Sequence, residues 1–230
     1  MRPDQETTLE VRTTAAALAA PLLLVPFALI AALVAVRYEP LHEFDLRVTD
    51  HLHRFAVTHP GWADAMQWWS LIFHPTTWRI AAALLVVWLW RRHARGLAVW
   101  AGATMAAGAL LGVLLKLLFG RHRPDLLDPV AQATGYAFPS GHALTNALGA
   151  AVFLMVLLPL VRDRPLAKAA LWTAGVVIPL VTAFTRVGLG VHWTSDVVAG
   201  LLLGVALVAL TSLALQRRVS RRRVAQSVSG

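Results

Sequence analysis

Cysteine is absent from this chain of 230 residues, and charged residues are scarce. The lack of cysteine excludes disulfide bonds, thiolate metal sites and a cysteine nucleophile, and it leaves the cellular compartment open. Only 14% of the residues are charged and 57% are hydrophobic, against roughly 25% and about 45–50% in a soluble domain. A soluble protein of this size could not bury so much apolar surface, so the composition predicts a protein whose solvent is lipid.

The few charges are mostly basic, with 21 lysines and arginines against 12 acidic residues and a net charge of +9. In a soluble protein this balance would suggest nucleic acid as a partner. Here the cations stand at the ends of long apolar segments, where membrane orientation and anionic headgroups both favour them. We therefore expect membrane lipids, and no nucleic acid, as partners. The pattern carries no signal for an oligomeric state.

The apolar segments predict an all-α, polytopic membrane protein with a bundle of six transmembrane helices. The first segment contains Pro21 and Pro26, which spanning helices tolerate. It is too long for a signal peptide, and the residues before it are not clearly basic. A single membrane domain of residues 14–215 would lie between two cytoplasmic tails, residues 1–13 and the strongly basic residues 216–230. The predicted spans are residues 14–36, 77–90, 96–118, 143–161, 169–184 and 197–215.

Residues 38–78 differ from the rest of the chain because they hold acidic residues, histidines and tryptophans together. Tryptophan prefers the membrane–water interface, so this stretch predicts a loop followed by an interfacial helix between the first and second spans. Its histidines could form a metal cluster, but the close pair lacks the i,i+4 spacing of helical ligands and no HExxH pattern accompanies it. We interpret them as solvated loop residues, and we predict no metal and no other cofactor. The histidines are His42, His51, His53 and His59.

Counting cations gives an orientation. Six helices place both termini on one side, and that side carries thirteen lysines and arginines against eight on the other. The positive-inside rule therefore predicts cytoplasmic termini. The polar motifs at the end of the third span, the start of the fourth, and between the fifth and sixth then meet at the external face.

Ser140, Gly141 and His142 follow a proline and open an apolar helix. A helix start offers unpaired N–H groups and the positive end of the helix dipole, which favour an anion. Ser140 is a natural N-cap whose hydroxyl could also bind a phosphate oxygen, and Gly141 would let that oxygen approach the backbone. Capping alone does not account for His142, an ionisable group at the mouth of a membrane helix.

His192 and Asp196 are four residues apart, so on a helix they share one face. A carboxylate that accepts a hydrogen bond from one imidazole nitrogen leaves the other free to attack. A simple pair that closes a loop is the alternative. The cations Lys116, Arg123 and Arg186 could be membrane anchors whose head groups reach the interface, but guanidinium groups also match phosphate oxygens in pairs.

Together these motifs resemble the signature of the type 2 phosphatidic acid phosphatase superfamily. The pattern is Lys-x6-Arg-Pro, then Pro-Ser-Gly-His, then Ser-Arg-x5-His-x3-Asp, and the resemblance extends over about residues 14–215. Thr185 stands where the family usually has serine, which keeps the hydroxyl and adds a methyl group. The matching residues are Lys116, Arg123, Pro124, Pro139, Ser140, Gly141, His142, Arg186, His192 and Asp196.

The resemblance implies a metal-independent phosphomonoesterase or pyrophosphatase. His192 would be the nucleophile that forms a phosphohistidine, Asp196 would orient it, and His142 would protonate the leaving group. Arg121 and His122 occupy other positions in the first motif. They either widen the cationic rim for a second phosphate or are ordinary loop residues. The residues implied to hold the phosphate oxygens are Lys116, Arg123, Ser140, Gly141 and Arg186.

A site at the external face suits a lipid phosphate as substrate, and the resemblance implies undecaprenyl pyrophosphate, phosphatidylglycerol phosphate or phosphatidic acid. A lipid phosphotransferase using the same intermediate is one alternative. An anion or lipid transporter is another, disfavoured because the chain shows no internal repeat and its polar groups gather at one face. The spanning segments exclude the architecture of a soluble haloperoxidase.

Overall fold

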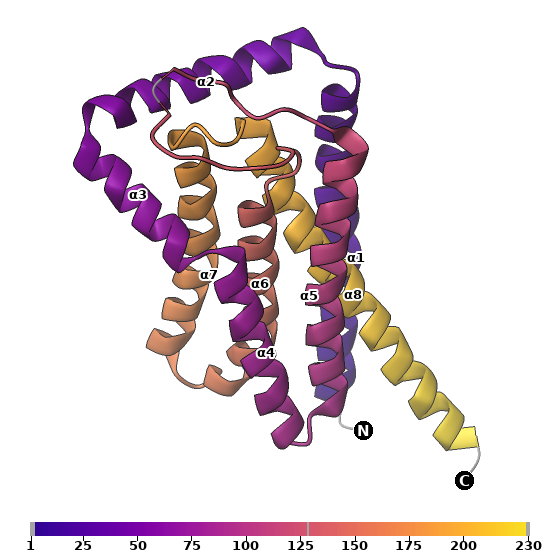
Figure 1. Cartoon of the computed structure of the whole chain (residues 1–230). Coiled ribbons are helices and arrows are strands. Elements are labelled where there is room, and N and C mark those ends of the chain that lie inside the picture. Colours follow the sequence, from indigo (N-terminus) through magenta and orange to yellow (C-terminus); the bar gives the residue numbers. More distant parts are fainter. Residues whose placement is uncertain (1–2, 128, 229–230) are drawn as a thin grey trace.

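The computed structural model describes residues 3–127 and 129–228, including the side chains within 19–127 and 129–216. The regular structure in these ranges is entirely helical (Figure 1), which confirms the all-α prediction. The elements are α1 (Pro3–Ala35), α2 (Glu39–Thr58), α3 (Pro60–Ile72), α4 (Pro75–Arg91), α5 (Arg95–Phe119), α6 (Gly141–Leu157), the 3₁₀ turn η1 (Leu158–Val161), α7 (Pro165–Gly188) and α8 (Thr194–Val228).

The helices have the lengths and composition of membrane spans. Five stretches of the described chain are long and apolar enough to cross a bilayer. The number of candidate spans rises to six if α1 and α2, which are bent by 98° relative to each other, are taken as one span. This agrees with the predicted multi-pass architecture. The five stretches are Pro60–Arg91, Arg95–Phe119, Gly141–Val161, Pro165–Gly188 and Thr194–Gln216.

The two predicted tails are not separate segments in the described backbone. The first helix already begins at Pro3, and α8 continues without a break to Val228. The boundaries at residues 13 and 216 therefore mark changes in composition rather than the ends of helices.

The loop predicted after the first span is wrong, because residues 39–58 form α2, which lies across the end of the bundle (Figure 1). The buried positions of α2 are Asp45, Thr49, His53 and Ala56, spaced by three or four residues. Three of these four side chains are polar, and the partly buried Val48 and Leu52 pack beside them against the bundle, so polar residues interrupt a face with helical periodicity. His53 is buried as well, and its Nε2 lies 2.9 Å from the Leu127 carbonyl oxygen, so it is not a solvated loop histidine. The described residues contain no group of three potential metal-ligating side chains.

The tryptophan-rich stretch forms α3, which leads into α4 through a short break at Phe73 and His74. Asn146 of α6 stabilises this break, since its side-chain amide donates to the Phe73 carbonyl oxygen at 2.8 Å. The Asn146 side-chain oxygen accepts from the Trp78 indole at 2.7 Å. The break is thus held against the centre of the bundle.

Helix α6 is the central element and contacts α4, α5, α7 and α8. Its first turns are buried, and α8 approaches them closely through two glycines. A Cβ added at Gly200 would lie 2.8 Å from the Ser140 carbonyl oxygen, and one at Gly204 would lie 2.7 Å from that of Leu144. Small residues allow such close packing of membrane helices. In this way α8 is fixed beside the start of α6.

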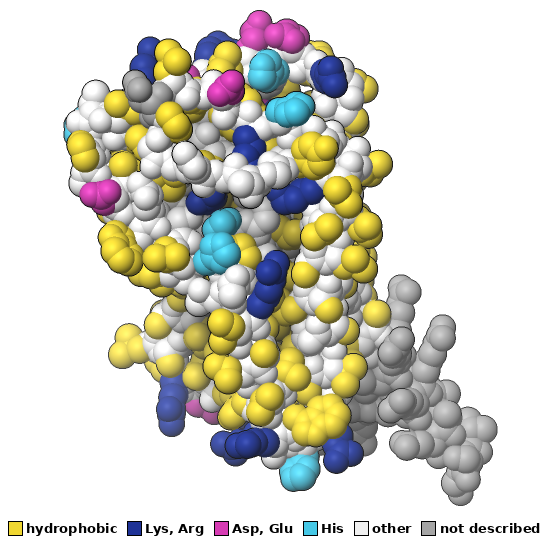
Figure 2. All heavy atoms as spheres, viewed as in Figure 1, with side chains coloured by type: hydrophobic (Ala, Val, Ile, Leu, Met, Phe, Trp, Pro, Cys, Tyr) yellow, Lys and Arg dark blue, Asp and Glu magenta, His cyan; other side chains and the backbone are white. Residues whose placement is uncertain are grey.

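The surface divides along the bundle axis. Figure 2 shows mainly hydrophobic side chains around the middle, with lysine and arginine side chains at the lower end and charges of both signs over α2 at the other end. Both termini lie at the end opposite α2 (Figure 1). The basic side chains of the α4–α5 and η1–α7 connections belong to that end: Arg91, Arg92, Arg95, Arg162, Arg164 and Lys168.

Candidate active site

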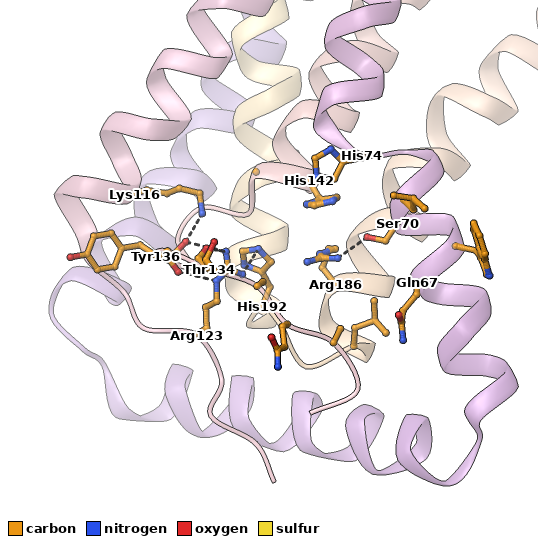
Figure 3. A pocket seen from close by; sticks show the side chains of 18 of the residues that line it. Gln67, Ser70, His74, Lys116, Arg123, Thr134, Tyr136, His142, Arg186 and His192 are labelled. Carbon is orange, nitrogen blue, oxygen red and sulfur yellow. Dashed lines mark hydrogen bonds between the residues drawn. The ribbon is translucent and has the colours of Figure 1, made fainter. Parts of the chain in front are cut away.

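A cavity of about 760 Å³ opens at the α2 end of the bundle, between α3, the ends of α5 and α7, and the long connection before α6 (Figure 3). Two of the eight predicted site residues, Ser140 and Asp196, are fully buried behind its wall. The structure therefore brings all eight together, although they come from separate parts of the chain. The other six line the cavity directly: Lys116, Arg123, Gly141, His142, Arg186 and His192.

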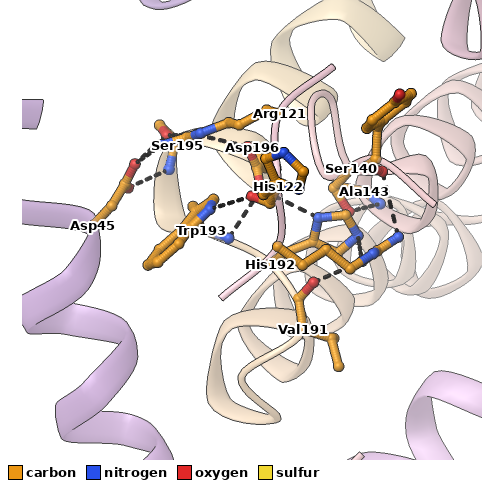
Figure 4. Close-up of polar contacts among 12 residues, drawn as sticks. Asp45, Arg121, His122, Ser140, Ala143, Val191, His192, Trp193, Ser195 and Asp196 are labelled. Atoms are coloured by element: carbon orange, nitrogen blue, oxygen red, sulfur yellow. Dashed lines mark hydrogen bonds and ion pairs between the residues drawn. The ribbon is translucent and has the colours of Figure 1, made fainter. Parts of the chain in front are cut away.

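His192 and Asp196 form a buried pair at the inner end of the cavity (Figure 4). The distance from His192 Nδ1 to Asp196 Oδ2 is 3.3 Å. The same carboxylate oxygen accepts the Trp193 backbone N–H at 3.0 Å, which orients the carboxylate. If Nδ1 carries the proton and donates it to Asp196, Nε2 presents a lone pair toward the cavity.

Arg123 lies at the Nε2 side of His192. Its Nη1 is 3.0 Å from that nitrogen and also donates to the Val191 carbonyl oxygen at 2.6 Å. Its Nε donates to the Gly135 carbonyl oxygen at 2.9 Å. Backbone carbonyls thus hold the guanidinium in a fixed position, where a phosphate oxygen bound to it would lie beside the reactive nitrogen. Lys116 is held similarly, because its ammonium donates to the Tyr136 carbonyl oxygen.

The protonation state of His192 follows from its surroundings. Burial lowers the pKa of the His192 imidazole well below its ordinary value of 6.5, and the charges of Arg123, Arg186 and Lys116 lower this pKa further. Burial also lowers the pKa of Arg123, while the Asp196 carboxylate opposes this effect. His192 is therefore neutral at physiological pH, which is the form required of a nucleophile.

Ser140 is the N-cap of α6 and has no exposed surface. Its hydroxyl accepts the Ala143 N–H at 3.5 Å, and its own N–H donates to the Asp196 carbonyl oxygen at 3.0 Å. The next residue, Gly141, lines the cavity. The start of α6 is therefore directed at the cavity and joined through the backbone to the residue that orients His192, as an anion site at a helix N-terminus requires.

The outer wall adds residues that the motifs do not contain. Arg186 Nη1 donates to the hydroxyl of Ser70 on α3 at 2.7 Å, and Arg186 Nε is buried without a partner among the described residues. His74, at the α3–α4 break, meets His142 edge to face with 5.0 Å between ring centroids. Ser70 lies 116 positions from Arg186 in the chain, and His74 is also far in sequence from His142, so only the folded helices reveal them.

The structure supports neither interpretation of Arg121, and it also places Thr185. Arg121 does not widen the cationic rim, since it lies behind the cavity, where it donates to Asp196 at 2.7 Å and to Asp45 at 2.7 Å. The His122 side chain does not line the cavity either. Thr185 is buried, and its hydroxyl donates to the Thr182 carbonyl oxygen of its own helix at 2.7 Å. The threonine hydroxyl therefore serves the helix rather than the cavity.

Comparison with known proteins identifies the family. The sequence model of the PAP2 superfamily matches residues 97–220, a range that contains all three motifs. The chain belongs to the PAP2 superfamily. The resemblance expected from the motifs is thereby confirmed, and α2, with Asp45, lies outside the matched range.

The individual relatives are membrane-lipid enzymes by name. The chain is 29% identical over 134 residues to an undecaprenyl-diphosphatase of Sulfolobus acidocaldarius, covering 55% of this chain and 58% of that protein. It is 35% identical over 104 residues to phosphatidylglycerophosphatase B of Bacillus subtilis, covering 44% and 49%. It is 33% identical over 154 residues to a decaprenylphosphoryl-5-phosphoribose phosphatase of Mycobacterium tuberculosis, covering 65% and 78%. The chain thus spans about half the length of the first two relatives.

A solved structure shares the PAP2 fold. The crystal structure of a transmembrane PAP2-type phosphatidylglycerolphosphate phosphatase from Bacillus subtilis superposes with a TM-score of 0.74, covering 84% of this chain and 94% of the other. The two sequences are 22% identical, so this likeness concerns the fold. It supports the description of the chain as a multi-pass membrane protein.

Proposed function

We propose that this PAP2 protein is a membrane lipid phosphatase that hydrolyses a lipid phosphomonoester or pyrophosphate through a phosphohistidine. The observation that carries the proposal is the His192–Asp196 pair, whose Nε2 lies 3.0 Å from Arg123 in a cavity that Lys116, Arg186 and His142 also line. Fixed cations around the position of a phosphoryl group are the expected stabilisers of its transition state.

The chemistry has two steps. The Nε2 lone pair of His192 attacks phosphorus, the bond from phosphorus to the leaving oxygen breaks, and His142 gives a proton to that oxygen. A water then attacks the phosphohistidine, the P–N bond breaks, and His142 takes the proton from the water. The negative charge of the bound phosphate favours the protonated form of His142 in the first step. Asp196 balances the positive charge that forms on His192.

The membrane setting supports a substrate class and a face for the site. The candidates are undecaprenyl pyrophosphate, phosphatidylglycerol phosphate and phosphatidic acid, whose phosphates lie at headgroup level. The names of the relatives support this class. The greater number of basic side chains at the end with both termini supports cytoplasmic termini and an external active site.

The deciding experiment is phosphate release by the purified protein in detergent, with EDTA present and with these three lipids and a soluble phosphomonoester as substrates. We expect release from at least one lipid. The variant His192→Ala should lose at least about 1,000-fold in kcat, as expected when a catalytic nucleophile is removed. His51→Ala, an exposed histidine on α2, is the matched control and should keep full activity.

Other outcomes would contradict parts of the proposal. A His192→Ala variant with near-normal turnover would exclude His192 as the nucleophile. Activity that is lost in EDTA and restored by magnesium would contradict metal independence. Consumption of lipid phosphate without release, together with phosphorylation of an added acceptor lipid, would indicate a phosphotransferase.

A further inference from the structure

Arg121 is shared between two buried carboxylates (Figure 4). Its Nη1 donates to Asp196 Oδ1 at 2.7 Å and to the Ser195 hydroxyl at 2.7 Å, while its Nη2 donates to Asp45 Oδ2 at 2.7 Å. Both carboxylates have no exposed surface, whereas the Arg121 side chain is 14% exposed. A guanidinium buried so deeply is stable only beside negative charge. Here its two terminal nitrogens each donate to one carboxylate.

Asp45 ties α2 to the start of α8. Its Oδ1 accepts the Ser195 backbone N–H at 2.8 Å, and its Oδ2 accepts the Ser195 hydroxyl. Asp45 therefore binds one of the unpaired N–H groups in the first turn of α8, the turn that also carries Asp196. These contacts connect a helix at the membrane surface with the catalytic pair.

The charges form a line from Asp45 through Arg121 and Asp196 to His192. Arg121 occupies Oδ1 of Asp196 and leaves Oδ2 to the imidazole of His192 and to the Trp193 N–H. If Asp45 were neutral, the whole charge of Arg121 would act on Asp196, and less negative charge would remain to stabilise the imidazolium formed during attack. If Arg121 were removed, two buried carboxylates would lose their cation.

We propose that Asp45 and Arg121 are positioning residues that fix the orientation and the charge of Asp196, and through it the tautomer of His192. They do not touch the phosphate, because neither lines the cavity. The inference rests on the proposed role of His192 as nucleophile. It extends the catalytic centre to α2, a helix outside the range matched by the family.

The test uses Asp45→Asn as its main variant, because asparagine keeps the shape and can still accept the Ser195 N–H. We expect kcat for a hydrolysed lipid to fall roughly 10–100-fold, the range seen when hydrogen-bonded partners of active-site groups are removed. Competitive inhibition by inorganic phosphate should change less than about threefold, because Lys116, Arg123 and Arg186 stay in place and the binding of this ion requires no attack by His192. Arg121→Lys keeps the charge but cannot bridge both carboxylates in the same way, so its kcat should fall as in Asp45→Asn.

Two surface positions on α2 provide matched controls. Asp50→Asn removes a carboxylate that pairs with Arg54 at the surface, and Arg47→Gln removes an exposed arginine. Both should leave kcat and phosphate inhibition unchanged. Unchanged kcat in Asp45→Asn and Arg121→Lys would overturn the proposal. Parallel losses of kcat, phosphate affinity and thermal stability in detergent would also overturn it, because they would indicate a purely structural role.

A second measurement keeps this inference separate from the proposed function. The ¹⁵N NMR spectrum of histidine-labelled protein, with the His192 signal assigned from its loss in His192→Ala, reports the tautomer without any turnover. We expect the Nδ1–H form in the unsubstituted protein and a mixture of tautomers in Asp45→Asn. The same spectrum in Asp45→Asn and in the unsubstituted protein would overturn the positioning role. If Asp45→Asn loses the Nδ1–H form but the unsubstituted protein hydrolyses no lipid, only the proposed function is contradicted.

Discussion

At the residue scale, two arginines only two positions apart in the chain act on opposite ends of one pair. Arg123 contacts the Nε2 side of His192, and Arg121 contacts Asp196. The first arginine would hold phosphate beside the nucleophile, while the second is directed away from the cavity toward Asp45. A single motif therefore supplies both a binding cation and a cation buried behind the active site.

The lowered pKa of His192 has a measurable consequence for pH dependence. In the proposed reaction the neutral imidazole attacks phosphorus, so kcat/KM should fall as the pH drops through the pKa of His192. Because burial and the nearby cations lower that pKa, the acid limb should lie below pH 6.5. Arg123→Gln removes one of these cations, so the pKa of His192 should rise and the acid limb should move to higher pH. This shift is expected even if the variant is also slower.

The profile is measured for both proteins with one lipid phosphate, so that the ionisation of the substrate cancels in the comparison. Arg47→Gln should leave the limb where it is. An acid limb at the same pH in Arg123→Gln and in the unsubstituted protein would contradict the electrostatic control of His192 by Arg123.

The motif residues could be predicted from the sequence because their chemistry is concentrated at short spacings. His192 and Asp196 are four positions apart across the start of α8, which begins at Thr194, and Ser140 precedes an apolar helix. Asp45 could not be found in this way, because its partner Ser195 lies 150 residues further along the chain. It also stands among other acidic residues that are exposed, and no local pattern distinguishes it from them.

At the element scale, the spans could be predicted from local sequence, whereas the helix α2 could not. Spanning helices show themselves as uninterrupted apolar segments, because every face meets lipid or another apolar helix. The fully buried positions of α2 are Asp45, Thr49, His53 and Ala56, so polar side chains interrupt its apolar face and the segment resembles a polar loop in sequence. Its burial is favoured by the packing of Val48 and Leu52 against the bundle and by polar partners such as Arg121 and the Leu127 carbonyl oxygen.

The contact between α6 and α8 leads to a stability prediction. A Cβ at Gly204 would meet the Leu144 carbonyl oxygen, the Ala147 Cβ and the Leu148 nitrogen, all at 2.9 Å or less. None of these atoms belongs to a flexible side chain, so Gly204→Ala should destabilise the protein by about 1–3 kcal/mol, the usual cost of overpacking. Thermal unfolding in detergent measures this change.

The matched control is Gly96→Ala in the first turn of α5, where an added Cβ meets no atom within 4 Å. Alanine has the higher helix propensity, so this variant should be as stable as the unsubstituted protein or slightly more stable. Equal stabilities of the two variants would show that α6 and α8 can move apart without a loss of stability.

At the scale of the whole molecule, the cavity lies at the α2 end of the bundle, and both termini lie at the opposite end (Figure 1). The absence of cysteine makes the orientation directly measurable, because a single introduced thiol has no background. Leu127 is 91% exposed in the connection beside the cavity, and Leu166 is 86% exposed at the start of α7. The two positions lie at opposite ends of the bundle.

In intact cells, a membrane-impermeant maleimide should label Leu127→Cys and should label Leu166→Cys only after permeabilisation. This result follows from the excess of basic side chains at the end with the termini, which the positive-inside rule assigns to the cytoplasm. The cysteine-free protein is the control. The reverse labelling pattern would place the active site in the cytoplasm and would restrict the substrates to lipid phosphates of the inner leaflet.

The hydrogen bond from the Ser140 N–H to the Asp196 carbonyl oxygen joins the start of α6 to the start of α8. Together with the approach of Gly200 to the Ser140 carbonyl oxygen, it makes the anion-binding turn and the His–Asp pair one mechanical unit. Such a unit cannot open to admit a lipid without dismantling its own chemistry. If the substrate is the proposed lipid phosphate, we therefore expect its chain to enter and leave past the opposite wall, which α3 lines with Gln67, Trp68 and Leu71.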